Sequence, residues 1–371
     1  MRKVPKLRFK EFSDEWEEKK LGEISEIIMG QSPDSKNYNE KNIGLPLIQG
    51  NADCKNRKVY PRLYTSEITK ESIPNDIIMT VRAPVGAIAF SNIHSCIGRG
   101  VCAIRNTNNF IYHYLIKLEN SWEKISQGST FTAVNSNDIK KLQLILPNIQ
   151  EQEKIANFLS SVDKKISLTE EKLELFREYK KGVMQKIFSQ ELRFKDSNGN
   201  DYPEWEEKKL GEISKICTGK LDANAMVENG RYRFYTCAKE FYYIDSYSFD
   251  TEALLISGNG ANVGYIHYYK GKFNAYQRTY VLDNFEENII FIKYILEKNL
   301  KTRIEKEKNS GNTPYIVLSV LTDMVLQIPT LEEQQKIADF LSSIDNKIES
   351  IEKELEGLKE FKKGLLQQMF V

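Results

Sequence analysis

Apolar residues recur at alternating steps of four and three along two stretches of the chain that contain no proline. In the first stretch these positions begin with Ile155, Leu159, Val162, Ile166, Thr169, Leu173 and Phe176, and in the second with Ile337, Leu341, Ile344, Ile348, Ile351, Leu355 and Leu358. A heptad pattern that continues for more than four repeats is typical of a coiled coil. We therefore predict two long helices that pack against each other along this seam.

Each predicted helix has a recognisable beginning. A proline ends the preceding apolar run, a capping residue follows it, and a glutamate stands three residues further on, the spacing of a capping box. These residues are Pro147, Asn148 and Glu151 in the first helix, and Pro329, Thr330 and Glu333 in the second. The predicted helical segments are 147–190 and 329–371.

Lys180 and Lys362 interrupt the two seams at the same place. Either the coiled coil frays there and the lysines extend to water, or each lysine sets the register or meets an acidic surface. Phe158 and Phe340 lie beside the seam. They either widen its apolar stripe toward another protein or cover the base of their own domain.

The chain repeats itself. The segment 16–27, which begins at Trp16, returns from Trp205 with eleven of twelve positions identical, and 151–161 returns at 333–343. The middle segments between these repeats share little. We therefore predict a first variable domain (1–146), a first helix (147–190), a linker with a second variable domain (191–328), and a second helix (329–371). Because 189–204 is too short for a long return, we expect the helices to be antiparallel.

Both variable segments have the pattern of mixed α/β domains. Buried strands are predicted at 77–81 and 254–257, each followed by a glycine turn and a second strand (83–90 and 261–268). Apolar helices follow at 110–116 and 289–296, and a last strand precedes each proline. The predicted fold class is α/β: two mixed α/β domains joined by two long antiparallel helices that form a coiled coil, with internal pseudo-twofold symmetry.

Composition narrows the class of protein. The 371 residues carry a net charge of only +1, less than a generic nucleic-acid binder usually has. No apolar run approaches the roughly 20 residues that span a bilayer, and no apolar stretch follows the first basic residues as in a secretory signal. The five cysteines include no C-x-x-C pair, so we predict free thiols and a cytoplasmic location.

Polar residues suited to DNA gather in the predicted loops. Arg, Asn and Gln pair with guanine and adenine edges, whereas Ser, Thr and Lys suit phosphate. The candidates in the first domain are Gln31, Ser32, Gln49, Asn51, Arg82, Arg99, Ser129 and Thr130. Those in the second are Lys220, Arg231, Arg233, Lys239, Asn259, Asn262, Gln277, Arg278, Asn312 and Thr313.

Catalytic and metal-binding signatures are missing from the sequence. The three histidines have no spaced partners, and His113 falls in an apolar helical pattern typical of a core residue. The run Gly258-x-Gly260 is not followed by the helix and acidic residue of a dinucleotide site, so a turn explains it. Glu17 and Glu18 in the repeated anchor are interpreted as a solvated surface or a helix start. No Asn/Asp-Pro-Pro-Tyr/Phe run, the base pocket of amino-methyltransferases, occurs.

The order of these parts resembles the DNA-specificity subunit of type I restriction–modification systems. The resemblance covers essentially the whole chain and rests on the Trp16–Ile24 anchor, on the Glu-Gln-x-x-Ile-Ala-x-Phe-Leu run after Pro147, and on the second copy of each. It implies that each variable domain reads one half of a split, asymmetric double-stranded DNA site. It also implies that two methyltransferase subunits dock on the helices and that two restriction/translocase subunits join them. S-adenosylmethionine, ATP and magnesium would then belong to the partners, and this chain would have no active site, cofactor or metal.

Two other interpretations stay open at this stage. One is the recognition part of a fused methyltransferase, which the missing base-pocket motif and the short length disfavour. The other is a coiled-coil scaffold that binds only protein, which would not explain why two duplicated domains differ in their loops.

Overall fold

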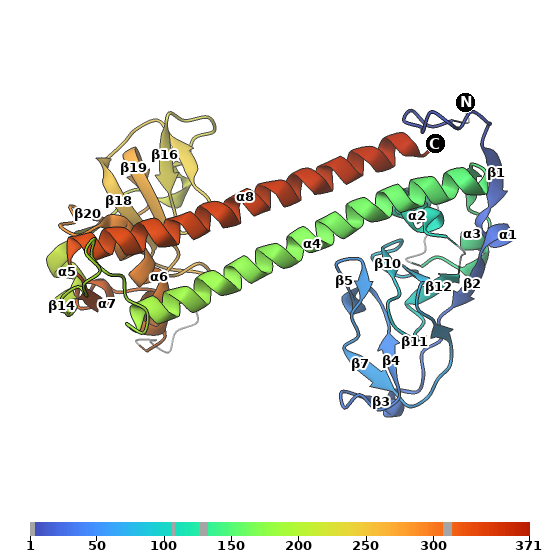
Figure 1. Ribbon diagram of the computed structural model, residues 1–371, viewed down its shortest axis with the longest axis horizontal. Coiled ribbons are helices and arrows are strands. Elements are labelled where there is room, and N and C mark those ends of the chain that lie inside the picture. The colour runs from blue at the N-terminus through green and yellow to red at the C-terminus, as the bar shows by residue number, and fades with distance from the viewer. Residues whose placement is uncertain (1–3, 106–107, 127–132, 307–313) are drawn as a thin grey trace. The chain divides into compact units, whose positions relative to one another are not determined.

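The computed structural model describes residues 4–105, 108–126, 133–306 and 314–371, which form two compact units (Figure 1). The first unit comprises residues 1–170 together with 353–371, and the second comprises 171–352. Each long helix therefore contributes one part to each unit. Within the described ranges, no helix combines the length and the apolar character needed to cross a membrane.

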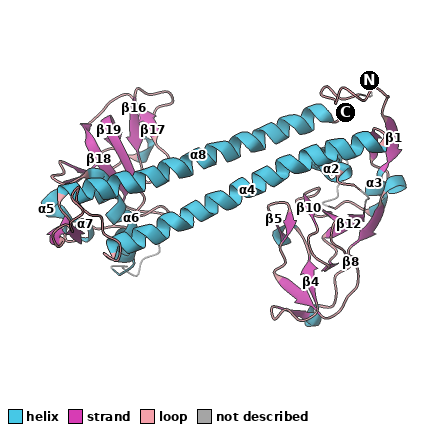
Figure 2. Ribbon diagram, in the orientation of Figure 1, coloured by secondary structure: helices cyan, strands magenta, loops and turns pink. Residues whose placement is uncertain are grey.

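The first unit is a mixed α/β structure (Figure 2). A six-stranded sheet has the order β2-β12-β9-β10-β6-β5, and a five-stranded sheet has the order β3-β7-β4-β11-β8. The strands are β1 (Glu17–Lys20), β2 (Glu26–Met29), β3 (Tyr38–Asn39), β4 (Leu45–Ile48), β5 (Cys54–Lys55), β6 (Lys58–Val59), β7 (Leu63–Thr65), β8 (Glu71–Ser72), β9 (Ile77–Thr80), β10 (Ile88–Phe90), β11 (Ser95–Ile97), β12 (Val101–Arg105) and β13 (Gln143–Leu146). The helices are α1 (Leu21–Ile24), α2 (Phe110–Ser126), α3 (Ser136–Lys140) and the part of α4 (Ile149–Phe188) up to residue 170, with short 3₁₀ turns at Ser35–Asn37 and Asn51–Asp53.

The second unit repeats this plan with a simpler sheet of order β15-β20-β18-β19-β16-β17. Its strands are β14 (Glu206–Lys209), β15 (Lys215–Thr218), β16 (Tyr232–Tyr235), β17 (Tyr242–Ile244), β18 (Phe249–Ser257), β19 (Ile266–Ala275), β20 (Thr279–Asp283) and β21 (Val325–Ile328). Its helices are α5 (Leu210–Ile213), α6 (Ile289–Lys306), α7 (Leu318–Thr322) and the part of α8 (Leu331–Met369) up to residue 352, with a 3₁₀ turn at Ala223–Ala225. The mixed α/β class and the long helices agree with the sequence prediction.

The predicted buried strands form the centre of each sheet. All four residues of β9 are buried, and β9 lies between β10 and β12, with Met79 opposite Ile88 and Cys102. In the second unit Leu254 of β18 pairs with Leu282 of β20. Strands buried on both faces are continuous apolar runs, which is why the sequence shows them clearly.

Parts of the long helices complete the core of each unit. In the first unit Ile155 and Leu159 of α4 share a cluster with Leu365, Met369 and Phe370 from the 353–371 segment. In the second unit Ile187 shares a cluster with Ile337 and Leu341. Among the other predicted seam residues, Val162, Leu173 and Ile344 are buried, whereas Ile166, Phe176, Ile348, Leu355 and Leu358 are half-buried.

Ion pairs show that the helix segments are antiparallel inside each unit. In the first unit Asp163 pairs with Lys362 at 2.5 Å and Glu170 pairs with Lys359 at 2.7 Å, so residue numbers rise in one helix as they fall in the other. In the second unit Arg177 pairs with Glu352 at 2.5 Å, and Lys180 pairs with Asp345 at 2.6 Å. The predicted antiparallel pairing is therefore found in both units.

Lys180 and Lys362 do not mark frayed ends. Their side chains are only 18% and 12% exposed, and α4 and α8 continue to Phe188 and Met369. Lys180 also lies 5.0 Å from the centre of the Tyr294 ring. Each lysine interrupts the apolar seam because it pairs with a carboxylate of the facing helix, which is the register-setting alternative.

The Glu-Glu-Lys-Lys run of the repeated tryptophan anchor forms a strand and not the start of a helix. Glu17 pairs with Leu146 in the β1–β13 ladder, and Glu206 pairs with Ile328 in the equivalent β14–β21 ladder. All four residues of β1 are exposed, which agrees with the expected solvation. The Glu-Glu-Lys-Lys run has no apolar alternation, so its strand comes from tertiary pairing rather than from local pattern.

Each predicted capping box is only half formed. The Glu151 amide donates to Asn148 Oδ1 at 3.0 Å, as in a capped helix. The Glu151 carboxylate, however, accepts two hydrogen bonds from Arg8 at 2.7 and 2.8 Å and is fully buried. An arginine on the N-terminal segment therefore replaces the backbone donor that a capping box uses.

Phe158 and Phe340 cover their own units. Phe158 packs edge-on against Phe9, with ring centroids 5.9 Å apart, and Phe340 packs against Phe194 at 5.6 Å. This settles the alternative in favour of packing against the segment that leads into each variable domain.

Candidate nucleic-acid interface

Three loops of the first unit converge beside the ends of β2, β4 and β12. The Gln31 amide donates to Ile97 O at 2.9 Å, and the Arg99 amide donates to Ser32 Oγ at 3.1 Å. The Gly98 amide donates to Ile48 O at 2.8 Å, which brings in the loop that carries Gln49. Four of the predicted residues, Gln31, Ser32, Gln49 and Arg99, thus lie in one cluster.

Arg82 joins this cluster from the turn after β9. The preceding amide, Val81 N, donates to Gly100 O at 2.9 Å, and Arg82 forms an isolated bridge with Ala133. The side chains of Arg82 and Arg99 are exposed, and no carboxylate in the described part of the chain pairs with either. Two guanidinium groups are therefore available to a ligand on this face.

Not every predicted side chain in the first cluster is free. Gln49 is half-buried, and its side-chain amide donates from Nε2 to Tyr38 Oη at 3.1 Å. The Asp53 carboxylate accepts from the backbone N–H of Gln49 at 2.8 Å and pairs with Arg62 at 2.7 Å. It therefore holds the turn that presents Asn51. Asn51 itself is exposed.

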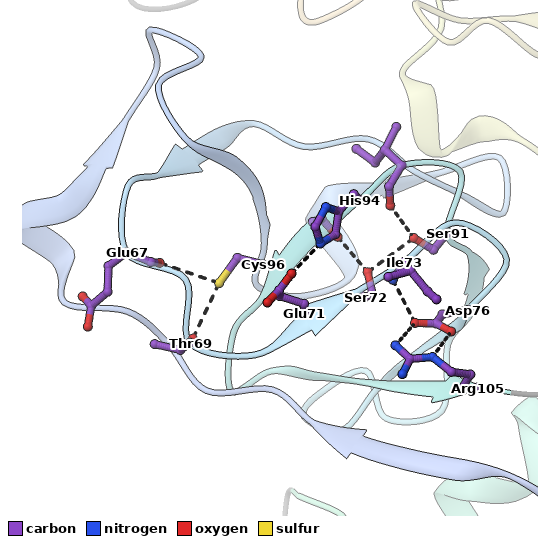
Figure 3. Close-up of polar contacts among 12 residues, drawn as sticks. Glu67, Thr69, Glu71, Ser72, Ile73, Asp76, Ser91, His94, Cys96 and Arg105 are labelled. Atoms are coloured by element: carbon purple, nitrogen blue, oxygen red, sulfur yellow. Dashed lines mark hydrogen bonds and ion pairs between the residues drawn. The ribbon is translucent and has the colours of Figure 1, made fainter.

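Figure 3 shows polar contacts elsewhere in the first unit, one of which involves Thr69 and Cys96. Thr69 lies within 3.5 Å of Cys96 Sγ, and its hydroxyl donates to Gln31 O. Further along, Arg105 makes two bonds of 3.0 and 3.1 Å to the buried Asp76 carboxylate, which also accepts from the Ile73 amide. The Thr69 hydroxyl therefore ties its own segment to the loop that carries Gln31, and the Arg105–Asp76 pair is a separate contact.

The second unit gathers its own loops in the same way. The Gln277 amide donates to Leu221 O at 2.9 Å, and the Gly258 amide donates to Arg278 O at 2.8 Å. Asn262 Nδ2 donates to Cys237 O at 3.0 Å, next to the loop that carries Lys239. A pocket of about 290 Å³ lies here, lined by Thr218, Gly258, Gln277, Arg278, Tyr280 and Ile316.

Arg231 and Arg233 lie away from this second cluster, at and within β16. Arg231 pairs with Asp245 at 3.7 Å and donates to its carbonyl. Arg233 lies between the rings of Phe241 and Tyr269, 4.2 and 4.5 Å from their centres. Both arginines therefore have partners within the unit, although the Arg231 side chain is still 71% exposed, and their predicted contact with DNA stays a prediction.

Four predicted residues lie outside the described residues: Ser129, Thr130, Asn312 and Thr313. Their described neighbours approach the two clusters in the same manner. Ala133 bridges to Arg82 in the first unit, and Tyr315 bridges to Asn259 in the second.

The two clusters share one backbone scaffold. Gly30 N donates to Val101 O at 3.0 Å, and Gly219 N donates to Thr279 O at 3.2 Å. Four further backbone bonds of the first unit each have a counterpart in the second. Gly98 N to Ile48 O (2.8 Å) corresponds to Tyr276 N to Tyr235 O (2.9 Å), and Val101 N to Gly98 O (3.1 Å) corresponds to Thr279 N to Tyr276 O (2.8 Å). Val81 N to Gly100 O (2.9 Å) corresponds to Gly258 N to Arg278 O (2.8 Å), and Gly86 N to Thr80 O (2.9 Å) corresponds to Gly264 N to Ser257 O (2.8 Å). The scaffold therefore assigns equivalent positions without reference to sequence similarity.

Glycine is required at two pairs of these positions. Gly86 and Gly264 have φ angles of +87° and +83°, and a Cβ atom there would meet Trp122 at 2.4 Å or Ile304 at 2.8 Å. A Cβ atom on Gly30 would lie 2.2 Å from Gly98 O, and one on Gly219 would lie 1.9 Å from Ala275 O. Gly30 and Gly219 stand 189 residues apart, as the tryptophan anchors do, so this equivalence was detectable in the sequence.

Sequence reasoning found no counterpart of Gln49 in the second unit, and the fold places the buried Thr236 there. Thr236 follows β16 as Gln49 follows β4. The last residue of β16, Tyr235, accepts from Tyr276 N, and the last residue of β4, Ile48, accepts from Gly98 N. The Thr236 hydroxyl accepts from the Ala238 amide at 3.2 Å. No local pattern marks Thr236, because only the fold aligns β4 with β16.

The histidines do not form a reactive group with one another. His113 is fully buried, its Nε2 lies 3.2 Å from Ser160 Oγ, and burial lowers its pKa to about 3. This agrees with its prediction as a core residue. Burial also lowers the pKa of His267, which lies 3.0 Å from Ala238 O. Among the described residues no cluster of three or more His, Cys, Asp or Glu side chains could hold a metal ion, and the five cysteines are free thiols, as predicted.

Comparison with known proteins identifies the family. The family model for the type I restriction modification DNA specificity domain matches residues 13–175 and again residues 202–360. The chain belongs to this family. The two specificity domains each include one loop cluster and most of one long helix.

Individual relatives carry the same description. The chain is 40% identical over 167 residues to the EcoDI type I restriction enzyme specificity subunit of Escherichia coli, which covers 44% of this chain and 37% of that protein. It is 33% identical over 192 residues to the putative MjaX specificity subunit of Methanocaldococcus jannaschii, covering 50% and 45%. The matches thus span less than half the length of either relative.

A crystal structure of a type I restriction-modification S subunit from M. genitalium resembles this chain in fold. The TM-score is 0.68 at 20% identity, and the match covers 99% of both chains. The specificity-domain fold therefore extends over the whole chain.

Proposed function

We propose that this chain is the DNA-recognition subunit of a type I restriction–modification complex. Each loop cluster reads one half of a bipartite, asymmetric site on double-stranded DNA. The long helices bind two methyltransferase subunits and set the gap between the half-sites, and two restriction/translocase subunits complete the complex.

One observation carries this proposal: a shared backbone scaffold presents unlike polar side chains in the two units. Arg82 occupies the position of Asn259, and Arg99 occupies the position of Gln277. These are the side-chain types that pair with base edges in the major groove. Two binding surfaces for the same ligand would retain the same side chains, whereas two readers of different sequences need different ones.

The helices offer a surface for the proposed methyltransferase subunits. Tyr179 of α4 is 52% exposed and Phe361 of α8 is 54% exposed, and the two stand 182 residues apart, as Pro147 and Pro329 do. Large exposed aromatic side chains are typical anchors of protein interfaces. One such anchor on each helix suits two copies of one partner.

The chemistry is assigned to the partners. In this proposal the chain is not an enzyme, and S-adenosylmethionine, ATP and magnesium are used by the methyltransferase and restriction/translocase subunits. Methyl transfer by the highly purified chain, without partners, would contradict this assignment.

Exchange of the second variable segment tests the recognition function. Residues 205–328 are replaced by the corresponding segment of a relative, and the hybrid is reconstituted with the methyltransferase subunits. Methylated positions are then mapped on genomic DNA. We expect one half-site to change and the other to stay the same, because each cluster lies within one unit.

The matched control replaces residues 16–146 instead, which should change only the other half-site. If either exchange alters both half-sites, or alters neither, the proposal that each cluster reads one half-site is wrong. A coiled-coil scaffold without DNA specificity would give a complex whose methylation pattern is the same in both hybrids.

A further inference from the structure

The scaffold places the candidate side chains at equivalent points of the two clusters. Three pairs are defined by the matched backbone bonds: Gln31 with Lys220, Arg82 with Asn259, and Arg99 with Gln277. The equivalence follows from Gly30 and Gly219, from the bridges to Ala133 and Tyr315, and from the bonds that enclose each 98–100 or 276–278 turn.

These side chains add little to the cores. All are exposed except Asn259, which is half-buried, and none belongs to a hydrophobic cluster. Gln277 donates to Asp222 Oδ1 at 2.7 Å, which uses one of its two amide hydrogens and leaves the other hydrogen and the carbonyl oxygen for a ligand. The matched backbone bonds hold each pair of residues at equivalent positions, so the two side chains of a pair differ mainly in chemistry.

At two of the three pairs the first unit has an arginine where the second unit has a side-chain amide. Arginine pairs bidentately with guanine O6 and N7, and asparagine or glutamine pairs bidentately with adenine N6 and N7. The first cluster has arginine at both positions, and the second has asparagine and glutamine.

We propose that these matched positions address corresponding base pairs of the two half-sites, so that one positional code serves both units. Arg82 and Arg99 select guanine in the first half-site. Asn259 and Gln277 select adenine at the corresponding positions of the second. The inference rests on the proposed function and adds to it the identity of the specificity-determining side chains.

Reciprocal substitution tests the code. The full chain, reconstituted with its methyltransferase subunits, is incubated with a duplex library in which both half-sites are randomised, and the bound fraction is sequenced. Arg99→Gln should turn a guanine preference into an adenine preference at one position of the first half-site, by about tenfold. Gln277→Arg should make the reverse change at the corresponding position of the second half-site.

The outcomes separate this inference from the proposed function. Weaker binding to every sequence, with base preferences kept, would mean that Arg99 contacts phosphate, and the code would be wrong. Changes at positions that do not correspond in the two half-sites would also overturn it. If the unsubstituted complex selects no half-sites, the proposed function itself fails.

Arg99→Lys guards against loss of folding, because the lysine ammonium keeps the charge and can also donate to guanine O6 and N7. It should retain most of the affinity and the guanine preference, and a switch to adenine in this variant would overturn the code. The pair Arg82→Asn and Asn259→Arg repeats the test at the second matched position.

Discussion

Arg193 and Glu333 form an ion pair in the second unit in which the glutamate is buried. The Glu333 carboxylate is fully buried and accepts from Arg193 at 2.9 and 3.2 Å and from Trp205 Nε1 at 3.1 Å. Arg8 and Glu151 repeat the pair in the first unit, and each glutamate raises the pKa of its arginine, mainly through the hydrogen bond. Removing one partner of such a pair leaves the other charge buried without compensation.

We expect Arg193→Met to lower the free energy of unfolding by about 3–5 kcal/mol, because Glu333 has no access to water. Urea denaturation followed by circular dichroism measures the loss. Arg177→Met is the matched control: its pair with Glu352 is 51% and 44% exposed, so it should cost less than about 1 kcal/mol. Equal losses in the free energy of unfolding in the two variants would mean that burial does not determine how much the Arg193–Glu333 pair contributes to stability.

At the scale of elements, the sequence predicted what depends on local pattern. The heptads of α4 and α8 and the apolar runs of β9 and β18 are continuous in the chain, and they form the expected helices and strands. The charged strand β1 and the pairing of Lys180 with Asp345 depend on residues far away in sequence, so no local pattern indicates them. The same holds for the candidate site: its loops were predicted, but the equivalence of Arg82 with Asn259 required the fold.

The exposed aromatic residues of α4 and α8 give a prediction at this scale. Tyr179→Ser and Phe361→Ser should each weaken the binding of one methyltransferase subunit by about 30-fold, because an aromatic anchor contributes about 2 kcal/mol. Native mass spectrometry of the reconstituted complex should show one subunit lost in each single variant and both in the double variant.

Tyr60→Ser is the control for this experiment, since Tyr60 is 61% exposed but lies in the first variable segment. It should leave the stoichiometry unchanged. Full occupancy in the double variant would place the methyltransferase interface elsewhere.

At the scale of the whole chain, each long helix belongs partly to one unit and partly to the other. The ion pairs of Asp163 and Glu170 lie in the first unit, and those of Arg177 and Lys180 lie in the second. Extra residues added to each helix close to the boundaries 170/171 and 352/353 would therefore leave every one of these pairs in register.

Such an insertion tests whether the helices set the gap in the DNA site. Four residues added after Glu171 and four after Lys353 lengthen each helix by about 6 Å. At roughly 3.4 Å per base pair, the gap should widen by about two base pairs while both half-sites stay the same. Methylation mapping of the reconstituted complex gives the result, and an unchanged gap with activity retained would contradict this role of the helices.

The first unit is built from two segments that are far apart in the sequence, and this affects the order in which the two units can fold during translation. Residues 171–352 make up the second unit without interruption, so all its parts have been synthesised before the last turns of α8 appear. Leu365, Met369 and Phe370, all nearly fully buried, enter the core of the first unit, where Phe370 packs 5.0 Å from Phe110. The unit whose synthesis starts first is therefore completed last, because the 182 residues of 171–352 are translated before the helix end that closes its apolar core.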